Sequence, residues 1–198
     1  MRLTQHYDPG AADAHFVIED NTFDSLTLLG IEVGQAAVID SFQRNSFTAI
    51  SASAGEPPAI ALNMSGDTAP ASRFAMIARA RGNQFIGNDI AIHWKGVGPI
   101  GRSSDFGKVG DLGNNVFRCN STAASSASGY DIDFGVAGDG ATTLYFAGNA
   151  WDNVPPTMVT QGTAPNGTDI YAETSPAPLL VTDGATRAMA ACPSGRTP

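Results

Sequence analysis

Two aspartates in one short segment have a spacing that suits carbohydrate chemistry. Asp131 and Asp133 stand two positions apart in a stretch with strand character, Tyr130-Asp131-Ile132-Asp133-Phe134. Residues two apart on a strand share one face at about 6.6–7 Å, which falls within the range of paired glycosidase carboxylates. The pair could therefore cleave a glycosidic bond, or contact a sugar or calcium. We favour a third interpretation, an acidic solvent-facing surface that flanks the inward-facing Ile132 and Phe134.

His93 and Lys95 share a face of another predicted strand, which begins at Asp89. They precede a loop that carries Arg102 and Asp105, so together these groups could polarise or bind an acidic sugar. The simpler interpretation of His93 is an ordinary exposed histidine. The catalytic candidates are Asp131, Asp133, His93 and Lys95. The candidate ligand contacts are Arg102, Asp105, Tyr130, Asp131 and Asp133.

The sequence predicts no cofactor, with calcium as the one alternative. Asp105, Asp111 and Asp139 stand in Gly-rich turns and could supply calcium oxygens, but no regular nonapeptide calcium repeat is present. Cys119 and Cys192 belong to no CxxC pair and have no histidine nearby, which disfavours zinc. They are either two buried thiols or one disulfide, and geometry alone decides between these.

The composition excludes several classes of function. The 198 residues carry a net charge of −8, and only 15% of them are charged. Nucleic-acid binding needs clustered Lys and Arg, and an anionic membrane surface also attracts cations. No apolar run approaches the roughly 20 residues of a membrane helix. The first six residues lack the apolar core of a signal peptide, so export is not visible in this chain.

The segments that must position these residues repeat one phrase: an apolar residue, two spacers, an asparagine, one spacer and an aromatic. Five copies occur, at 18–23, 42–47, 80–85, 112–117 and 146–151. A sixth, at 60–65, has lost the aromatic. The asparagines at 21, 45, 63 and 83 are separated by 24, 18 and 20 residues, and those at 83, 115 and 149 by 32 and 34. A period near 20 with short strands predicts a β-solenoid.

The longer intervals predict loops inserted at the corners of the coils. Gly96–Asp105 and the Ser- and Ala-rich Ser121–Gly129 are two such insertions. Insertions of this kind often gather on the binding face of a solenoid, so function is expected near them.

The repeated phrase has a physical explanation in a solenoid. Equivalent positions of stacked coils lie about 4.8 Å apart, so the aromatics form an inward column. The asparagine amides can donate and accept along a ladder. Asparagine also tolerates the left-handed backbone region, and Gly82 and Gly148 suit the same bend. A β-sandwich with Asn-rich turns is the alternative, but it does not account for the fixed spacing within the motif.

This pattern resembles the right-handed parallel β-helix proteins of the pectate-lyase-like superfamily. Within them it is similar to bacterial exported β-helix proteins of unassigned function, in which a segment like 111–117 precedes one like 148–151 and then a proline-containing corner, here 152–156. The resemblance covers about residues 14–183 and implies a secreted or cell-surface location. The catalytic motifs of the superfamily's lyases and hydrolases, such as Gly-His-Gly and Arg-Ile-Lys, are missing.

We therefore expect an all-β chain, 1–198, that forms a single right-handed parallel β-helix with short terminal caps and inserted loops. Coils span about 14–183, residues 1–13 form a lead-in or cap, and 184–198 form a tail in which 185–192 could be a short helix. The leading function is a non-catalytic extracellular module that is structural, adhesive or carbohydrate-binding, with a polysaccharide or cell-surface glycan as partner. The alternatives are a pectate-lyase-like enzyme and, because the caps are thin, a subunit that self-associates end to end.

Overall fold

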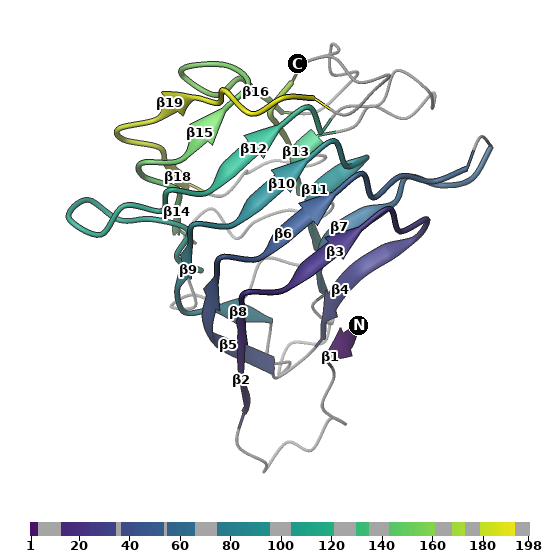
Figure 1. The fold of residues 1–198 in the computed structure, drawn as a ribbon. Coiled ribbons are helices and arrows are strands. Elements are labelled where there is room, and N and C mark those ends of the chain that lie inside the picture. Colours follow the sequence, from purple (N-terminus) through teal and green to yellow (C-terminus); the bar gives the residue numbers. More distant parts are fainter. Residues whose placement is uncertain are drawn as a thin grey trace.

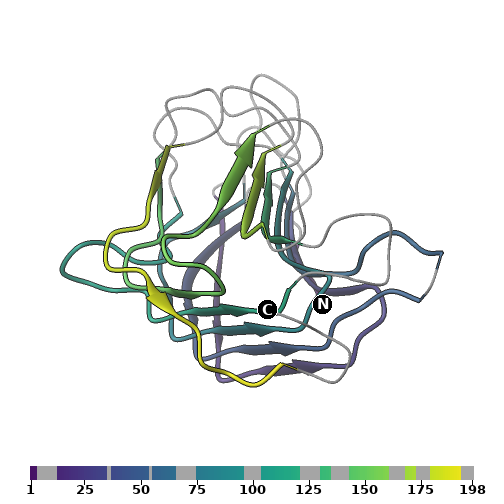
Figure 2. The ribbon, with the colours of Figure 1, turned by 90° about the horizontal axis from the view of Figure 1, so that it is seen from above.

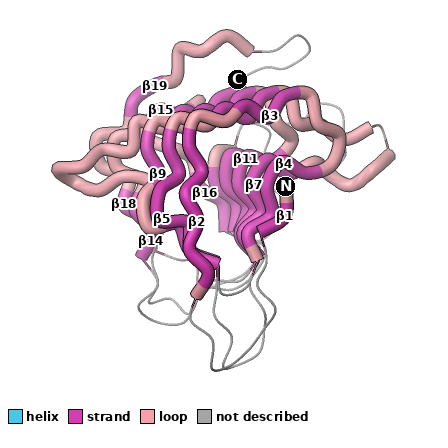
Figure 3. Tube along the Cα trace, turned by 60° about the horizontal axis from the view of Figure 1, so that its bottom comes forward, coloured by secondary structure: helices cyan, strands magenta, loops and turns pink. Residues whose placement is uncertain are grey.

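The chain forms stacked coils of short parallel strands. The computed structural model describes residues 1–3, 13–34, 37–53, 55–65, 75–95, 104–120, 130–134, 143–160, 168–172 and 179–192. In these ranges every pairing between the named strands is parallel, and no helix occurs (Figure 3). The prediction of a right-handed parallel β-helix is confirmed. No helix in these ranges has the length and apolar character that a membrane crossing requires.

Two long sheets form the main walls (Figure 1). The seven-stranded sheet has the order β1 (Arg2–Leu3), β4 (Leu29–Val33), β7 (Ile60–Ser65), β11 (Ile90–Lys95), β13 (Tyr130–Phe134), β17 (Ile170–Ala172) and β16 (Met158–Thr160). The six-stranded sheet has the order β19 (Thr186–Arg187), β15 (Ala150–Trp151), β12 (Val116–Arg118), β10 (Gln84–Ile86), β6 (Ser46–Thr48) and β3 (Thr22–Asp24).

The remaining strands form a third wall. One sheet contains β2 (Ala14–Glu19), β5 (Ala37–Gln43) and β8 (Met76–Ile77), with β9 (Ala80–Arg81) also paired to β5. Further along the solenoid, β14 (Thr143–Tyr145) pairs with β18 (Leu179–Val181). Seen from above, strands of successive coils lie over one another around a common interior (Figure 2).

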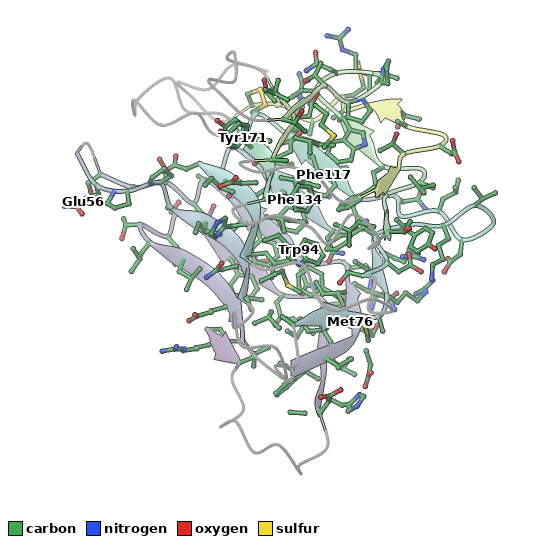
Figure 4. All side chains as sticks on the ribbon, turned by 180° about the vertical axis from the view of Figure 1, so that it is seen from behind. Glu56, Met76, Trp94, Phe117, Phe134 and Tyr171 are labelled. Atoms are coloured by element: carbon green, nitrogen blue, oxygen red, sulfur yellow. A yellow bond between two sulfur atoms is a disulfide. The ribbon has the colours of Figure 1, made fainter. Side chains whose placement is uncertain are left out.

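An aromatic column fills the interior side of the six-stranded sheet, as the repeat predicts. Ring centroids are 4.7 Å apart for Phe23–Phe47, 5.0 Å for Phe47–Phe85, 5.2 Å for Phe85–Phe117 and 4.6 Å for Phe117–Trp151. All these rings are fully buried except Phe23, which is half-buried at the end of the stack. Figure 4 shows Phe117 in this interior, near Trp94 and Phe134 of the opposite wall.

The asparagine ladder is also confirmed. Each asparagine after the first accepts on its side-chain oxygen from the backbone N–H and side-chain amide of the asparagine one coil earlier, at 2.8–3.1 Å. Its members are Asn21, Asn45, Asn83, Asn115 and Asn149. The sixth copy is the exception, because Asn63 lies in the middle of β7, where it pairs in register with His93 of β11. Its assignment to the ladder is wrong, since the aromatic that marks the corner is missing.

The left-handed conformation belongs to the residue before each ladder asparagine, rather than to the asparagine itself. These residues are Asp20, Arg44, Gly82, Asn114 and Gly148, with φ between 50° and 69°. Only two of the five are glycine. The expected role of Gly82 and Gly148 in the bend is confirmed, whereas the expected left-handed asparagine is wrong.

A second corner follows five residues later, and the sequence analysis missed it. Asn88 accepts at 3.0 Å from the backbone N–H of Ile50, and it donates from its own backbone and amide to Asn120 at 3.0 Å. The signal was present in the sequence, because Asn83 and Asn115 are each followed by an aromatic after two residues and by an asparagine after five.

The C-terminal segment is not helical in its described part, so the helix expected at 185–192 is wrong. Thr186–Arg187 instead form β19, the last strand of the six-stranded sheet. The following residues are held by a hydrogen bond of 3.0 Å from Arg118 to the Ala190 carbonyl. The Cys119–Cys192 disulfide then closes the segment onto the coil that precedes β15, which resolves the two possibilities for the cysteines.

Candidate functional site

Six side chains from six successive strands align on the outer face of the seven-stranded sheet. We call them the polar row: Arg2, Glu32, Asn63, His93, Asp133 and Tyr171. Strand alternation places them opposite the interior, because the residues on either side of His93, Ile92 and Trp94, are buried in the core. A parallel register repeats about every 4.8 Å, so the six groups form one continuous line across the coils.

Neighbours in the polar row contact one another. Arg2 and Glu32 form an ion pair at 3.0 Å. His93 Nδ1 lies 3.1 Å from Asn63 Oδ1, and His93 Nε2 lies 3.8 Å from Asp133 Oδ2. Because the Asn63 oxygen can only accept, Nδ1 carries the proton that it donates. Protonation of Nε2 would then give an ion pair with Asp133.

The row ends at an aromatic pair. Tyr171 of β17 stacks on Tyr130 of β13, with ring centroids 4.7 Å apart and an interplanar angle of 17°. Tyr130 is buried, whereas Tyr171 is half-buried. Figure 4 shows Tyr171 at this end of the solenoid, away from the core rings Trp94 and Phe134. Such a pair can offer an apolar surface beside the polar groups.

Asp131 and Asp133 do not form an acidic surface, so that interpretation is wrong. Only 3% of Asp131 and 8% of Asp133 is exposed, and every residue of β13 is buried. Asp133 belongs to the polar row beside His93. Asp131 aligns with Ala91 of the previous coil, a position that is fully buried there. Its carboxylate Oδ1 accepts from the Asn120 amide at 2.8 Å, so the two aspartates have different partners.

Asp131 lies near a second carboxyl group, that of Asp169, which precedes β17. No hydrogen-bond donor among the described residues reaches Asp131 Oδ2. Burial, then the negative charges of Asp169 and Asp152, raises the pKa of Asp131 well above its usual range. The raised pKa favours the protonated, neutral form of this buried carboxyl group.

The two neighbouring acids have donors of their own. Asp169 Oδ2 accepts from the Thr157 backbone at 2.6 Å, the Thr157 hydroxyl at 2.7 Å and the Asn153 amide at 3.0 Å. Asp152 accepts from Arg118 at 3.0 Å and from the Cys119 backbone at 2.8 Å. Burial raises the pKa of Asp152 despite these donors. The alignment of Asp131-Ile132 with Asp169-Ile170 was the signal that could have predicted the carboxyl pair.

Among the remaining candidates, the one whose side chain the structure describes, Asp105, lies outside the polar row. Asp105 pairs in register with Tyr145 of β14. Its carboxylate forms ion pairs at 3.0 Å with both Arg81 and Lys108. Lys95 ends β11 opposite Ser65, and its side chain lies outside the described part. Arg102 and both predicted insertions, except for Ser104–Asp105, also lie outside the described residues.

The two calcium candidates that the structure describes, Asp105 and Asp111, form ion pairs with Arg and Lys side chains of the protein. Asp111 binds Arg81 at 2.8 Å and Arg79 at 3.1 Å, and these two guanidinium groups hold its pKa well below the usual range. Asp139 lies outside the described residues. In the part of the chain that the structure describes, no group of three or more His, Cys, Asp or Glu side chains could hold a metal ion.

Comparison with known proteins gives one match. Searches of curated proteins and of solved structures found no match. One family model matches residues 11–158, which include the ladder, the aromatic column and most of the polar row. The chain therefore belongs to the family described as Protein of unknown function (DUF1565).

Proposed function

We propose that this protein is a non-catalytic β-helix module that binds a glycan along the polar row. The observation that carries the proposal is the alignment of amide, imidazole, carboxylate, guanidinium and phenol groups on one line across six strands. A glycan offers a repeating series of hydroxyl groups, and a solenoid offers a repeating series of side chains. The two repeats can be matched over several sugar units without any single deep pocket.

The chemistry of the row suits a neutral glycan. Asn63 and His93 can both donate and accept hydrogen bonds, and carboxylates accept from sugar hydroxyls. Tyr171 on Tyr130 can pack against the apolar face of a sugar ring. Glu32 and Asp133 lie in the row, and the chain carries a net charge of −8, so a polyanionic glycan would be repelled.

An extracellular or cell-surface location is part of the proposal. The disulfide between Cys119 and Cys192 supports it, because disulfides persist mainly in oxidising compartments. The resemblance to exported β-helix proteins points in the same direction.

A glycan array followed by titration calorimetry tests this function. The wild-type chain should bind at least one neutral oligosaccharide, and Asn63→Ala or His93→Ala should weaken that binding about tenfold, or about 1.4 kcal/mol. Gln84→Ala is the matched control, because Gln84 is an exposed polar residue on the six-stranded sheet. Equal loss in the control and the row variants would contradict the proposal, as would an array without any bound glycan.

A carbohydrate-active enzyme is the second candidate, and the contact between His93 and Asp133 favours it. A histidine polarised by a carboxylate can move a proton at a sugar hydroxyl. Asp131 is less suited to catalysis, because it is buried and its Oδ1 accepts from the Asn120 amide. Turnover of a bound glycan that Asp133→Asn abolishes would favour the enzyme, whereas binding without products favours the module.

A further inference from the structure

The two ends of the solenoid expose complementary edges of one sheet. β3 and β19 are the first and last strands of the six-stranded sheet, and Figure 1 shows them at its opposite ends. The Asn21 carbonyl and the Ser25 N–H both face β6. Alternation therefore turns the N–H groups of Thr22 and Asp24 outward, where no described strand pairs with them. Open edges of this kind pair readily with another chain.

At the N-terminal end, the aromatic column and the asparagine ladder have no further neighbour among the described residues. Phe23 stacks on Phe47 alone within the column, and it is only half-buried. The side-chain oxygen of Asn21 receives no donor among the described residues, whereas that of Asn45 accepts from two groups of Asn21. The exposed large apolar residues here are Met1, Val17 and Leu28.

The C-terminal end offers the matching features. Arg187 pairs in register with Trp151, so it occupies the next position along the aromatic column, and it is exposed. The exposed large apolar residues of the last coils are Val154, Met158 and Met189. Outside the two ends, the exposed large apolar residues of the described chain are Val109 and Leu112, in one corner turn.

Charge decides how two copies can meet. Residues 13–34 contain five acidic residues and no Lys or Arg. Arg2 and Arg44 form ion pairs with three of these acids but offset only part of the negative charge, so two N-terminal ends would repel each other. Residues 179–192 at the C-terminal end contain one acidic residue, Asp183, and one basic residue, Arg187, so this segment lacks the negative charge of the N-terminal end. We propose that a second copy of this chain docks head to tail, with β3 of one copy extending the sheet from β19 of the next and Arg187 stacking on Phe23. A guanidinium on an aromatic face is a favourable contact.

Such an interface does not close on itself, because each copy keeps one free end. The wild-type chain should therefore show a mean mass in solution that rises with concentration beyond that of a dimer, measured by light scattering after size exclusion. Higher salt should weaken the association, because charge contributes to it. A chain that stays monomeric at every concentration overturns the proposal.

Two variants each block one end. Thr22→Pro removes an outward N–H from β3, and proline is tolerated on an edge strand. Arg187→Glu reverses the charge on the opposite end. For either variant alone, the protein concentration at which half of the chains are associated should rise at least tenfold. Circular dichroism checks folding, and Asp24→Pro replaces Thr22→Pro if that variant fails to fold, since Asp24 has the same outward N–H.

Mixing the two variants separates head-to-tail from head-to-head contacts. Each variant keeps one working end, so an equimolar mixture should form dimers and nothing larger. A mixture that stays monomeric while the wild type associates would contradict the head-to-tail arrangement. Glu56→Lys is the charge control, because Glu56 lies on a loop that projects from the side of the solenoid (Figure 4). Association that survives both end variants, or is lost in this control, would also overturn the proposal.

Discussion

The raised pKa of Asp131 makes the stability of this coil depend on pH. In the unfolded chain an aspartate releases its proton at about pH 3.9. In the folded chain burial and the charges of Asp169 and Asp152 raise the pKa of Asp131. Between the two values the folded state holds a proton that the unfolded state has released, so the free energy of unfolding falls as pH rises through this window.

Asp131→Asn should remove most of this dependence. The asparagine side chain does not titrate, and its oxygen can still accept from Asn120. Urea unfolding at several pH values above 4 should show a steeper fall for the wild type than for the variant, which keeps the part of the slope that Asp152 contributes. Equal slopes in the two chains would show that the folded structure does not raise the pKa of Asp131.

Ala49 provides a second test at this scale. It has a φ of 53° at the second corner, where a side chain costs roughly 1–2 kcal/mol. Glycine relieves that cost but adds entropy to the unfolded chain. Ala49→Gly should therefore raise the free energy of unfolding by about 0.5–1 kcal/mol.

The matched control is Ala150→Gly in β15, where glycine should lower the same quantity by about 0.5–1 kcal/mol. Destabilisation by both glycines would mean that Ala49 is not strained in solution.

Single residues were the hardest features to predict. The alternation rule placed Ile132 and Phe134 inside correctly, but it could not show that Asp131 lies at a corner beside Asn120. That contact depends on how two coils align, and the nine residues between Asn120 and Tyr130 hide the alignment in the sequence.

Among the structural elements, the aromatic column places some of the largest fully buried side chains in the interior. Phe85 is fully buried between Phe47 and Phe117. Phe85→Ala should lower the free energy of unfolding by about 3–5 kcal/mol, as truncation of core aromatics does. Phe23→Ala should cost less, because Phe23 is half-buried and has one neighbour in the column. Similar losses in denaturant unfolding would contradict the end position of Phe23.

The elements with repeated spacing were predictable from the sequence. Asn83 and Phe85 recur as Asn115 and Phe117, so both the ladder and the column follow from one motif. Asn63 was wrongly assigned to the ladder because the segment 60–65 contains the asparagine of the motif but not its aromatic residue. The polar row could not be predicted, because its alignment depends on the register between strands of different coils. The sequence alone does not specify that register.

In the whole molecule, the disulfide fixes the C-terminal segment to the coil that carries Cys119. The two cysteines are 73 residues apart, so the bond restricts a long loop of the unfolded chain. Replacing both cysteines with alanine should lower the free energy of unfolding by about 2–4 kcal/mol. The wild type in reducing agent should show a similar loss, and an unchanged unfolding midpoint in both experiments would contradict this role.

Glycan binding along the polar row is the central claim, and hydrogen exchange with and without the bound oligosaccharide tests it most directly. Binding should slow exchange in peptides that span β7, β11 and β13 and leave β6, β10 and β12 unchanged. Protection on the six-stranded sheet instead, or no protection at saturating oligosaccharide, would contradict the assignment of the binding face.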